Sequence, residues 1–316
     1  MSYSQLTSGE RSTISAMRAS GYRPCEIARC LGRHAATIYR ELKRNPHVSG
    51  GYSGYHAQQK ANKRRRETRC KPNYGPRHWR LVIFWIKQKW SPEQITKNFR
   101  KLGIVVPSHE RIYQYIWDDK ENGGTLHKHL RQSLKLRRKR RNSKDSRGRL
   151  SNKAHISERP KVIENRERIG DCEIDTVMGH GNKHCIVTIV ERLSGFTLIG
   201  KLKNRTVEEL NKRVISLIKF CPFKVRTVTA DNGTEFHGYK AIEKATGVKF
   251  YFATPYHSWE RGTSENTNGL IRQYLPKRCS MKEVSQWHCN TIAHCLNTRP
   301  RKRLGFSNPW ECINDA

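Results

Sequence analysis

The chain has 316 residues, with 62 Lys and Arg against 27 Asp and Glu, which gives a formal net charge of +35. An excess of this size favours a polyanionic partner and excludes an acidic-tail protein, a collagen or a mucin-like stalk. The length predicts two or three domains, and a hydrophobic content of 35% is enough to build their cores.

The apolar segments are short. The first twenty residues lack an apolar core, so we expect no secretory signal, and the run 81–86 is far shorter than the roughly 20 residues that cross a bilayer. The ten cysteines contain no C-x-x-C pair, and we expect reduced thiols. A zinc site at His288-Cys289 and His294-Cys295 is the weaker alternative, because the usual zinc spacings are missing. These features predict a soluble, intracellular protein.

Residues 20–44 have the pattern of a helix-turn-helix. Pro24 suits the first turn of one helix, Gly32 supplies a turn, and a second helix over residues 35–43 has an apolar face at Ile38. In such a motif the second helix enters the DNA major groove. The residues expected to contact DNA are Arg33, His34, Thr37, Arg40 and Arg44. An ordinary helical hairpin is the alternative.

A second, looser pair of helices is predicted further along. Ser91 and Pro92 mark one helix start, and Ser108 caps a further helix over residues 109–117. The connection between them, residues 102–107, is longer than a tight turn, so a purely structural helix pair remains the alternative to a helix-turn-helix.

Two stretches are dense in basic residues, Lys60–Lys71 and Lys128–Lys153. In the second, 12 of 26 residues are Lys or Arg and Asp145 is the only acid. Such like-charge blocks usually stay flexible until an anion neutralises them. If the anion is DNA, each phosphate contact releases a counterion, so binding should weaken steeply with salt.

From about residue 169 the pattern changes to that of a mixed α/β sheet domain. The predicted strands are 172–177, 185–190, 196–201, 225–229 and 248–252, and the predicted helices are 208–220, 264–274 and 283–296.

Three acids of this domain lie in or beside its elements. Asp175 is in the first strand, Asp231 follows the fourth strand and precedes an Asn-Gly turn, and Glu265 begins a helix. Carboxylates from these three places could converge on two hard divalent cations, as phosphoryl transfer requires. Strand register alone does not exclude Glu173 as the first ligand, and Glu260 is the rival for the last.

The sequence resembles the DDE-class insertion-sequence transposases, and more narrowly the family named after insertion sequence thirty. The resemblance covers nearly the whole chain and is most specific between residues 255 and 272. Its motifs are residues 21–44, Trp90-Ser-Pro-Glu-Gln-Ile, Ser108-His-Glu-Arg-Ile-Tyr, Glu173-Ile-Asp-Thr-Val, Thr229-Ala-Asp-Asn-Gly-Thr-Glu-Phe, Pro255-Tyr-His-Ser-Trp-Glu-Arg-Gly-Thr-Ser-Glu-Asn-Thr-Asn-Gly-Leu-Ile-Arg and the tail 296–309.

The resemblance implies a ribonuclease-H-like catalytic domain of the retroviral-integrase type. It implies that Asp175, Asp231 and Glu265 form a catalytic triad that binds two Mg²⁺ ions, which Mn²⁺ can replace. The 33 residues between Asp231 and Glu265 match the family's separation. Arg272 is expected to contact DNA near the site. Cys172 stands where relatives usually have Trp, which should alter packing rather than chemistry.

We therefore expect a transposase of the bacterial cytosol that binds the terminal inverted repeats of its element, cuts them and joins the freed 3′-hydroxyl to target DNA. The family's behaviour implies a homo-oligomer on paired ends. A catalytically silent, domesticated transposase that regulates through DNA binding is one alternative, and a ribonuclease H or structure-specific nuclease is another.

The expected architecture is a ribonuclease-H-like α/β domain preceded by all-α DNA-binding domains. The expected segments are 1–48 (helix-turn-helix), 49–78 (basic linker), 79–122 (second helix-turn-helix-like domain), 123–160 (basic linker) and 161–316 (catalytic domain).

Overall fold

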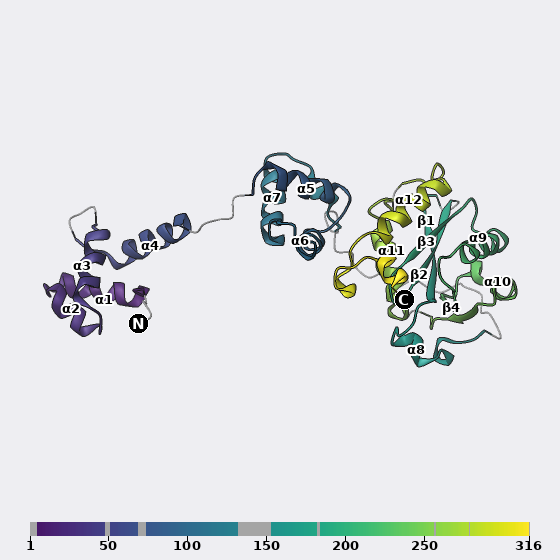
Figure 1. Ribbon diagram of the computed structural model, residues 1–316, viewed down its shortest axis with the longest axis horizontal. Helices are drawn as coiled ribbons and strands as arrows, with labels where there is room; N and C mark the ends of the chain where they lie inside the picture. Colours follow the sequence, from purple (N-terminus) through teal and green to yellow (C-terminus); the bar gives the residue numbers. More distant parts are fainter. Residues whose placement is uncertain are drawn as a thin grey trace. The chain divides into compact units, whose positions relative to one another are not determined.

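The computed structural model describes residues 5–47, 51–68, 74–131, 153–181, 184–255, 257–277 and 279–315. The chain divides into two compact units, Met1–Asn73 and Tyr74–Ala316 (Figure 1). Most of the basic stretch predicted at 128–153 lies outside the described residues.

The secondary structure of the first unit, over its described residues 5–47 and 51–68, is helical. Its helices are α1 (Ser8–Ala19), α2 (Pro24–Cys30), α3 (Ala35–Arg44) and α4 (Gly54–Thr68). Ile14, Ile27 and Ile38, one from each of the first three helices, are fully buried together. Gly32 links α2 to α3 with φ +61°, a conformation that glycine adopts without steric cost. The predicted turn and its two flanking helices are therefore present.

Helix α4 lies within the segment predicted to be a linker, and this is a difference from the sequence-based expectation. Ala57 and Ala61, one turn apart, are buried, and α4 packs against α1. At Gly54 an added Cβ would lie 2.5 Å from the main-chain oxygen of Arg11, so glycine allows the close approach of the two helices. Two small side chains and one glycine are enough to dock a helix whose other faces are charged.

The second unit begins with three helices, α5 (Pro76–Lys87), α6 (Pro92–Lys101) and α7 (His109–Glu121). Ser91 and Ser108 cap α6 and α7 as predicted, because each hydroxyl accepts a hydrogen bond from a main-chain N–H of the first turn. A shared apolar core includes Ile86, Ile95 and Ile112.

The rest of the second unit is built on one five-stranded sheet. Its strands are β1 (Asp171–Met178), β2 (Cys185–Glu191), β3 (Thr197–Leu202), β4 (Thr227–Ala230) and β5 (Lys249–Phe252). Their order is β3-β2-β1-β4-β5, with β1, β2 and β3 antiparallel and β4 and β5 parallel to β1. All five strands fall within a few residues of their predicted positions.

Helices cover both faces of this sheet (Figure 1). One core contains Ile174 of β1 and lies under α9 (Val207–Lys219) and α10 (Tyr239–Thr246); α10 was not predicted from the sequence. The other contains Val177 of β1 and lies under α11 (Gly262–Ile271) and α12 (Gln286–Asn297). Because side chains alternate along a strand, Asp175 shares the face of Val177, toward α11.

Short elements complete the second unit. They are α8 (Lys161–Glu164), α13 (Pro309–Asn314) and five 3₁₀ turns at Leu126–His129, Ile156–Glu158, Thr234–Phe236, Ser258–Arg261 and Lys302–Leu304. Within the described ranges, no helix has the length and apolar character that crossing a membrane requires. The predicted fold class, a helical helix-turn-helix region followed by a mixed α/β sheet with flanking helices, is confirmed.

Candidate active site

Two of the three predicted acids lie side by side, Asp175 within β1 and Asp231 directly after β4. The parallel register of β1 and β4 pairs Glu173 with Thr229, so continuing it by two residues brings Asp175 level with Asp231. Neighbouring strands are about 4.8 Å apart. Asp231 follows Ala230, the last residue of β4, and its Oδ1 accepts a hydrogen bond of 2.9 Å from the main-chain N–H of Gly233 in the turn.

Arg261 bridges these two carboxylates. Its Nη1 lies 3.5 Å from Oδ1 of Asp175, and its Nη2 lies 3.3 Å from Oδ2 of Asp231. The three side chains are only 15–27% exposed. A shared cation between two acids lowers the repulsion that would otherwise separate them. The guanidinium therefore marks a position where the fold favours positive charge.

Asp175 is also fixed by its surroundings. Its Oδ2 accepts a hydrogen bond of 2.7 Å from the amide of Asn268 on α11. The hydroxyl of Thr188 on β2 lies within hydrogen-bond distance of Oδ1 of Asn268, at 3.4 Å. Burial raises the pKa of Asp175, Arg261 acts to lower it, and the neighbouring Asp231 adds to the rise. The carboxyl is therefore oriented, and its burial favours a cation beside it.

Glu265 does not join the pair in this conformation. Its side chain is exposed on the first turn of α11. Among the described residues, no three His, Cys, Asp or Glu side chains come together in a group that could hold a metal ion. However, Glu265 lies three residues before Asn268, and side chains at this spacing share a face of a helix. It is thus on the part of α11 that approaches Asp175.

The rival acids have structural partners. Oε2 of Glu173 accepts a hydrogen bond of 2.8 Å from the main-chain N–H of Ser264 in the first turn of α11. Glu260 accepts from the main-chain N–H of Thr254, at 2.7 Å. Glu235, which was not among those rivals, is also buried and accepts from Nη2 of Arg205 at 2.6 and 2.7 Å. Each of these carboxylates is used in holding a loop or a helix start.

The predicted DNA contact Arg272 is held internally, since Nη2 donates to the main-chain oxygen of Met178 at 2.8 Å. Two other basic side chains bond to the asparagines that directly follow Glu265 and Asp231 in the sequence. Arg131 donates to Oδ1 of Asn266 at 2.9 Å, beside Glu265, and Lys153 bonds to the side chain of Asn232, beside Asp231.

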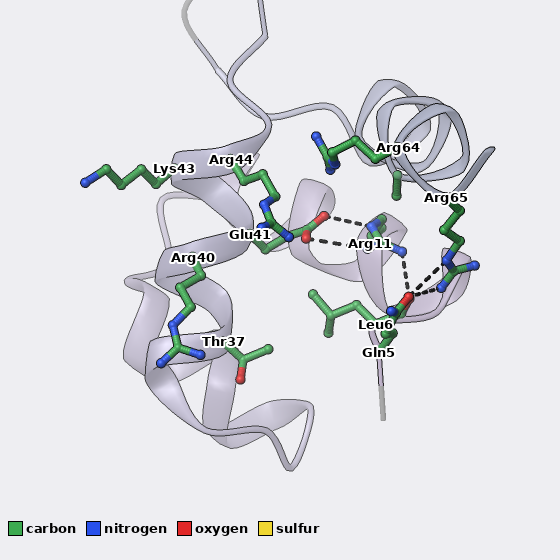
Figure 2. Close-up of a pocket in the computed structure, with 11 residues that line it drawn as sticks. Gln5, Leu6, Arg11, Thr37, Arg40, Glu41, Lys43, Arg44, Arg64 and Arg65 are labelled. Atoms are coloured by element: carbon green, nitrogen blue, oxygen red, sulfur yellow. Dashed lines mark hydrogen bonds and ion pairs between the residues drawn. The ribbon is translucent and has the colours of Figure 1, made fainter. Parts of the chain in front are cut away.

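The five candidate DNA-binding residues of the first unit separate into two groups. Arg33 pairs with Glu10 at 2.7 Å, and His34 caps α3 by accepting from the N–H of Ala36. By contrast, the three residues on the body of α3 line an open cavity (Figure 2): Thr37, Arg40 and Arg44. The first group is occupied in stabilising the fold, and the second lines the cavity.

Sequence reasoning missed Arg261 and Asn268. A signal for Arg261 was present, because a cation next to a helix N-terminus is unfavourable unless acids compensate for it. No local pattern distinguishes Asn268 from its neighbour Asn266, since only packing against β1 decides which amide reaches Asp175.

Comparisons with known proteins agree with this architecture. A helix-turn-helix domain family matches residues 2–45. The transposase for insertion sequence element IS4351 of Bacteroides fragilis is 41% identical over 97% of this chain and 94% of its own length. The IS1086 transposase of Cupriavidus metallidurans is 34% identical over 98% of this chain and 94% of its own length.

Transposase InsI of IS30A from Escherichia coli is 36% identical and covers 98% of this chain and 83% of its own length. Among solved structures, the catalytic core domain of BIV integrase matches with a TM-score of 0.37 at 20% identity, over 46% of this chain and 94% of that one. With full-length relatives at this level of identity, the chain belongs to the IS30 family of insertion-sequence transposases.

Proposed function

We propose that this transposase binds the terminal inverted repeats of its own element and, at a site formed by Asp175, Asp231 and Glu265, cuts the element end and joins it to target DNA. The observation that carries the proposal is the pair Asp175 and Asp231, held at one cationic position by Arg261. The full-length likeness to transposases supports the reaction class.

The donor set fits divalent cations. Asp175 and Asp231 supply carboxylate oxygens, which are ligands that Mg²⁺ prefers. Two Mg²⁺ ions held there would activate the attacking water or 3′-hydroxyl and stabilise the leaving oxygen. Glu265 would complete the set by a change of side-chain rotamer, since its side chain is exposed and its helical face approaches Asp175.

The chain's own residues supply the positioning that phosphoryl transfer needs. Asn268 and Thr188 orient Asp175, and the Gly233 N–H orients Asp231. Cations bound by the two carboxylates would replace Arg261 in neutralising them and would leave its side chain able to turn to the surface of the site. There its guanidinium can pair with a phosphate of the bound DNA, a role suited to its planar, bidentate donors.

DNA binding is assigned to the helix-turn-helix of the first unit. Thr37, Arg40 and Arg44 lie at positions i, i+3 and i+7 of α3, the spacing of one helical face. Contact of Arg33 and Arg272 with DNA would require their present internal bonds to be replaced or extended. Assembly of two or more protomers on paired ends is part of the same proposal and is drawn from the family.

The test uses the full chain and a labelled duplex that carries one end of the encoding element. We expect Mg²⁺-dependent cleavage and joining by the native protein, and loss of both in Asp231→Asn and Glu265→Gln, with DNA binding retained. Glu260→Gln is the matched control. Glu260 lies five residues before Glu265, and its carboxylate accepts a hydrogen bond from the main-chain N–H of Thr254.

The alternatives give different results. Binding of the ends without cleavage by any form of the protein would favour a silent regulator. Degradation of hybrid or branched substrates without joining would favour a nuclease. Full activity of Asp231→Asn would contradict the assignment of the acids.

A further inference from the structure

A basic cavity of about 690 Å³ lies between α3 and α4 in the first unit (Figure 2). Its lining contains six basic side chains, Arg11, Arg40, Lys43, Arg44, Arg64 and Arg65, and a single acid, Glu41. The family match ends at residue 45, so it includes α3 but not α4. The cavity therefore joins the predicted recognition helix to a helix with no assigned role.

One basic residue of the cavity is neutralised within the fold. Arg11 and Glu41 form a buried ion pair of 2.7 Å, and Arg11 also donates to the amide oxygen of Gln58 on α4 at 2.9 Å. This pair forms the floor of the cavity and ties α1, α3 and α4 together. The other five basic side chains surround that neutral floor, three on α3 and two on α4.

The two arginines of α4 are oriented by amide oxygens. Nη2 of Arg64 donates to Oδ1 of Asn45 at 2.7 Å, and Nε of Arg65 donates to Oε1 of Gln5 at 2.9 Å. An amide oxygen carries no net charge, so these two bonds act by setting the direction of each guanidinium. Partial pre-orientation also reduces the entropy lost when a ligand binds.

Helix α4 is held at a fixed place against α1. Gly54 permits main-chain contact, the side chains of Ala57 and Ala61 are buried, and Lys60 donates to the main-chain oxygen of Pro46 at 2.9 Å. The arginines of α4 are thus presented at a set distance from α3, and a duplex that α3 enters would meet them without rearrangement of the unit.

We infer that α4 is a second DNA-contacting element, in which Arg64 and Arg65 bind backbone phosphates of the strand that borders the groove occupied by α3. The inference rests on the proposed DNA-binding function of this unit. Phosphate contacts fix register and carry no base information. Helix α4 therefore adds affinity for any duplex, whereas Thr37, Arg40 and Arg44 supply discrimination.

The experiment measures equilibrium binding of the full-length protein to two labelled duplexes, one with the element end and one of unrelated sequence, over a range of salt concentrations. The test variant is R64A/R65A. The matched control is K60A/K63A, which removes two charges from the same helix at positions that do not line the cavity. It loses the exposed bond from Lys60 to Pro46 but keeps the buried contacts of Gly54, Ala57 and Ala61 that dock α4. R64K/R65K keeps both positive charges and tests whether charge alone supports binding. The circular dichroism spectrum of each variant reports on folding.

We expect R64A/R65A to weaken binding to both duplexes by the same factor and to reduce the slope of log K against log[salt] by about 1.8, since each phosphate contact contributes about 0.9. K60A/K63A should change the slope by much less, and R64K/R65K should restore most of the affinity. R44A should instead reduce the ratio of the two affinities.

The failures are distinguishable. If the native protein does not prefer the element end, the proposed function is wrong. If it does, and folded R64A/R65A binds with the same affinity and slope as K60A/K63A, then α4 does not contact phosphates. A loss confined to the element end would also overturn the inference, because it would indicate base contacts.

Discussion

Replacing Arg261 by Ala is expected to tighten the binding of a divalent cation by the DNA-free protein. In the structure the guanidinium lies 3.5 Å from Asp175 and 3.3 Å from Asp231, so an incoming cation must displace it. At an effective dielectric constant of about 20, each of these pairs has a Coulomb attraction of about 5 kcal/mol. Most of that attraction is offset by the cost of desolvating the charges.

The net effect should lie between that of exposed pairs, about 0.5 kcal/mol, and that of buried pairs, about 3–5 kcal/mol, because the three side chains are 15–27% exposed. A net 1–3 kcal/mol corresponds to about 5- to 150-fold tighter binding. The assay is titration with Mn²⁺, with free Mn²⁺ measured by electron paramagnetic resonance. Without any divalent cation, Arg261→Ala should also lower the melting temperature, and Mn²⁺ should restore it.

Arg272→Ala is the matched control, because it removes a guanidinium from the end of the same helix that is bonded to the main-chain oxygen of Met178 and not to a carboxylate. It should leave the affinity for Mn²⁺ within about twofold of the native value, well inside the range expected for Arg261. Unchanged or weaker Mn²⁺ binding by Arg261→Ala would refute the idea that the arginine stands where a cation binds.

Three further predictions concern the scaffold. Glu41→Gln, which leaves the buried guanidinium of Arg11 without its ion pair, should cost the first unit about 3–5 kcal/mol in urea unfolding; a loss below about 1 kcal/mol would contradict this. Gly170→Ala should destabilise the sheet domain by at least about 2 kcal/mol, because φ is +106° and the added Cβ would lie 2.3 Å from a main-chain oxygen; an unchanged thermal melt would contradict it. The hydrogen bond from Arg33 lowers the pKa of Glu10 from 4.5 to about 2, so its stabilisation is present above pH 4.5 and is lost as the pH falls toward 2; unfolding of Glu10→Gln should lack that part of the pH dependence.

Local chemistry was enough to predict many of the elements. Ser91 and Ser108 cap helices as expected, and Gly32 forms the turn of the helix-turn-helix, because each acts through bonds within a few residues. Helix α4 was not predicted, since its charge run concealed Ala57 and Ala61, and only the approach of α1 shows that they form a docking face.

The assignment of Asp175, Asp231 and Glu265 as the site's acids stays a prediction, and the side chains that support the first two were not predicted from the sequence. The sequence indicated Asp175 and Asp231 but did not exclude Glu173 as the first ligand. That choice depends on the pairing of β1 with β4, whose partner residues are 56 positions apart in the sequence. In the structure Glu173 holds the start of α11, which favours Asp175. Asn268 is recognisable only from the packing of α11 on β1, whereas the place of Arg261 at a helix N-terminus was a signal in the sequence.

The most direct measurement is a crystal structure of the protein with Mn²⁺ and a duplex carrying the element end, in which the ions are located by anomalous diffraction. We expect two Mn²⁺ ions about 3.5–4 Å apart, in contact with carboxylate oxygens of Asp175, Asp231 and Glu265, and Arg261 withdrawn from the acids. Two ions bound without Glu265, or Arg261 still bridging Asp175 and Asp231 in the loaded complex, would contradict the account.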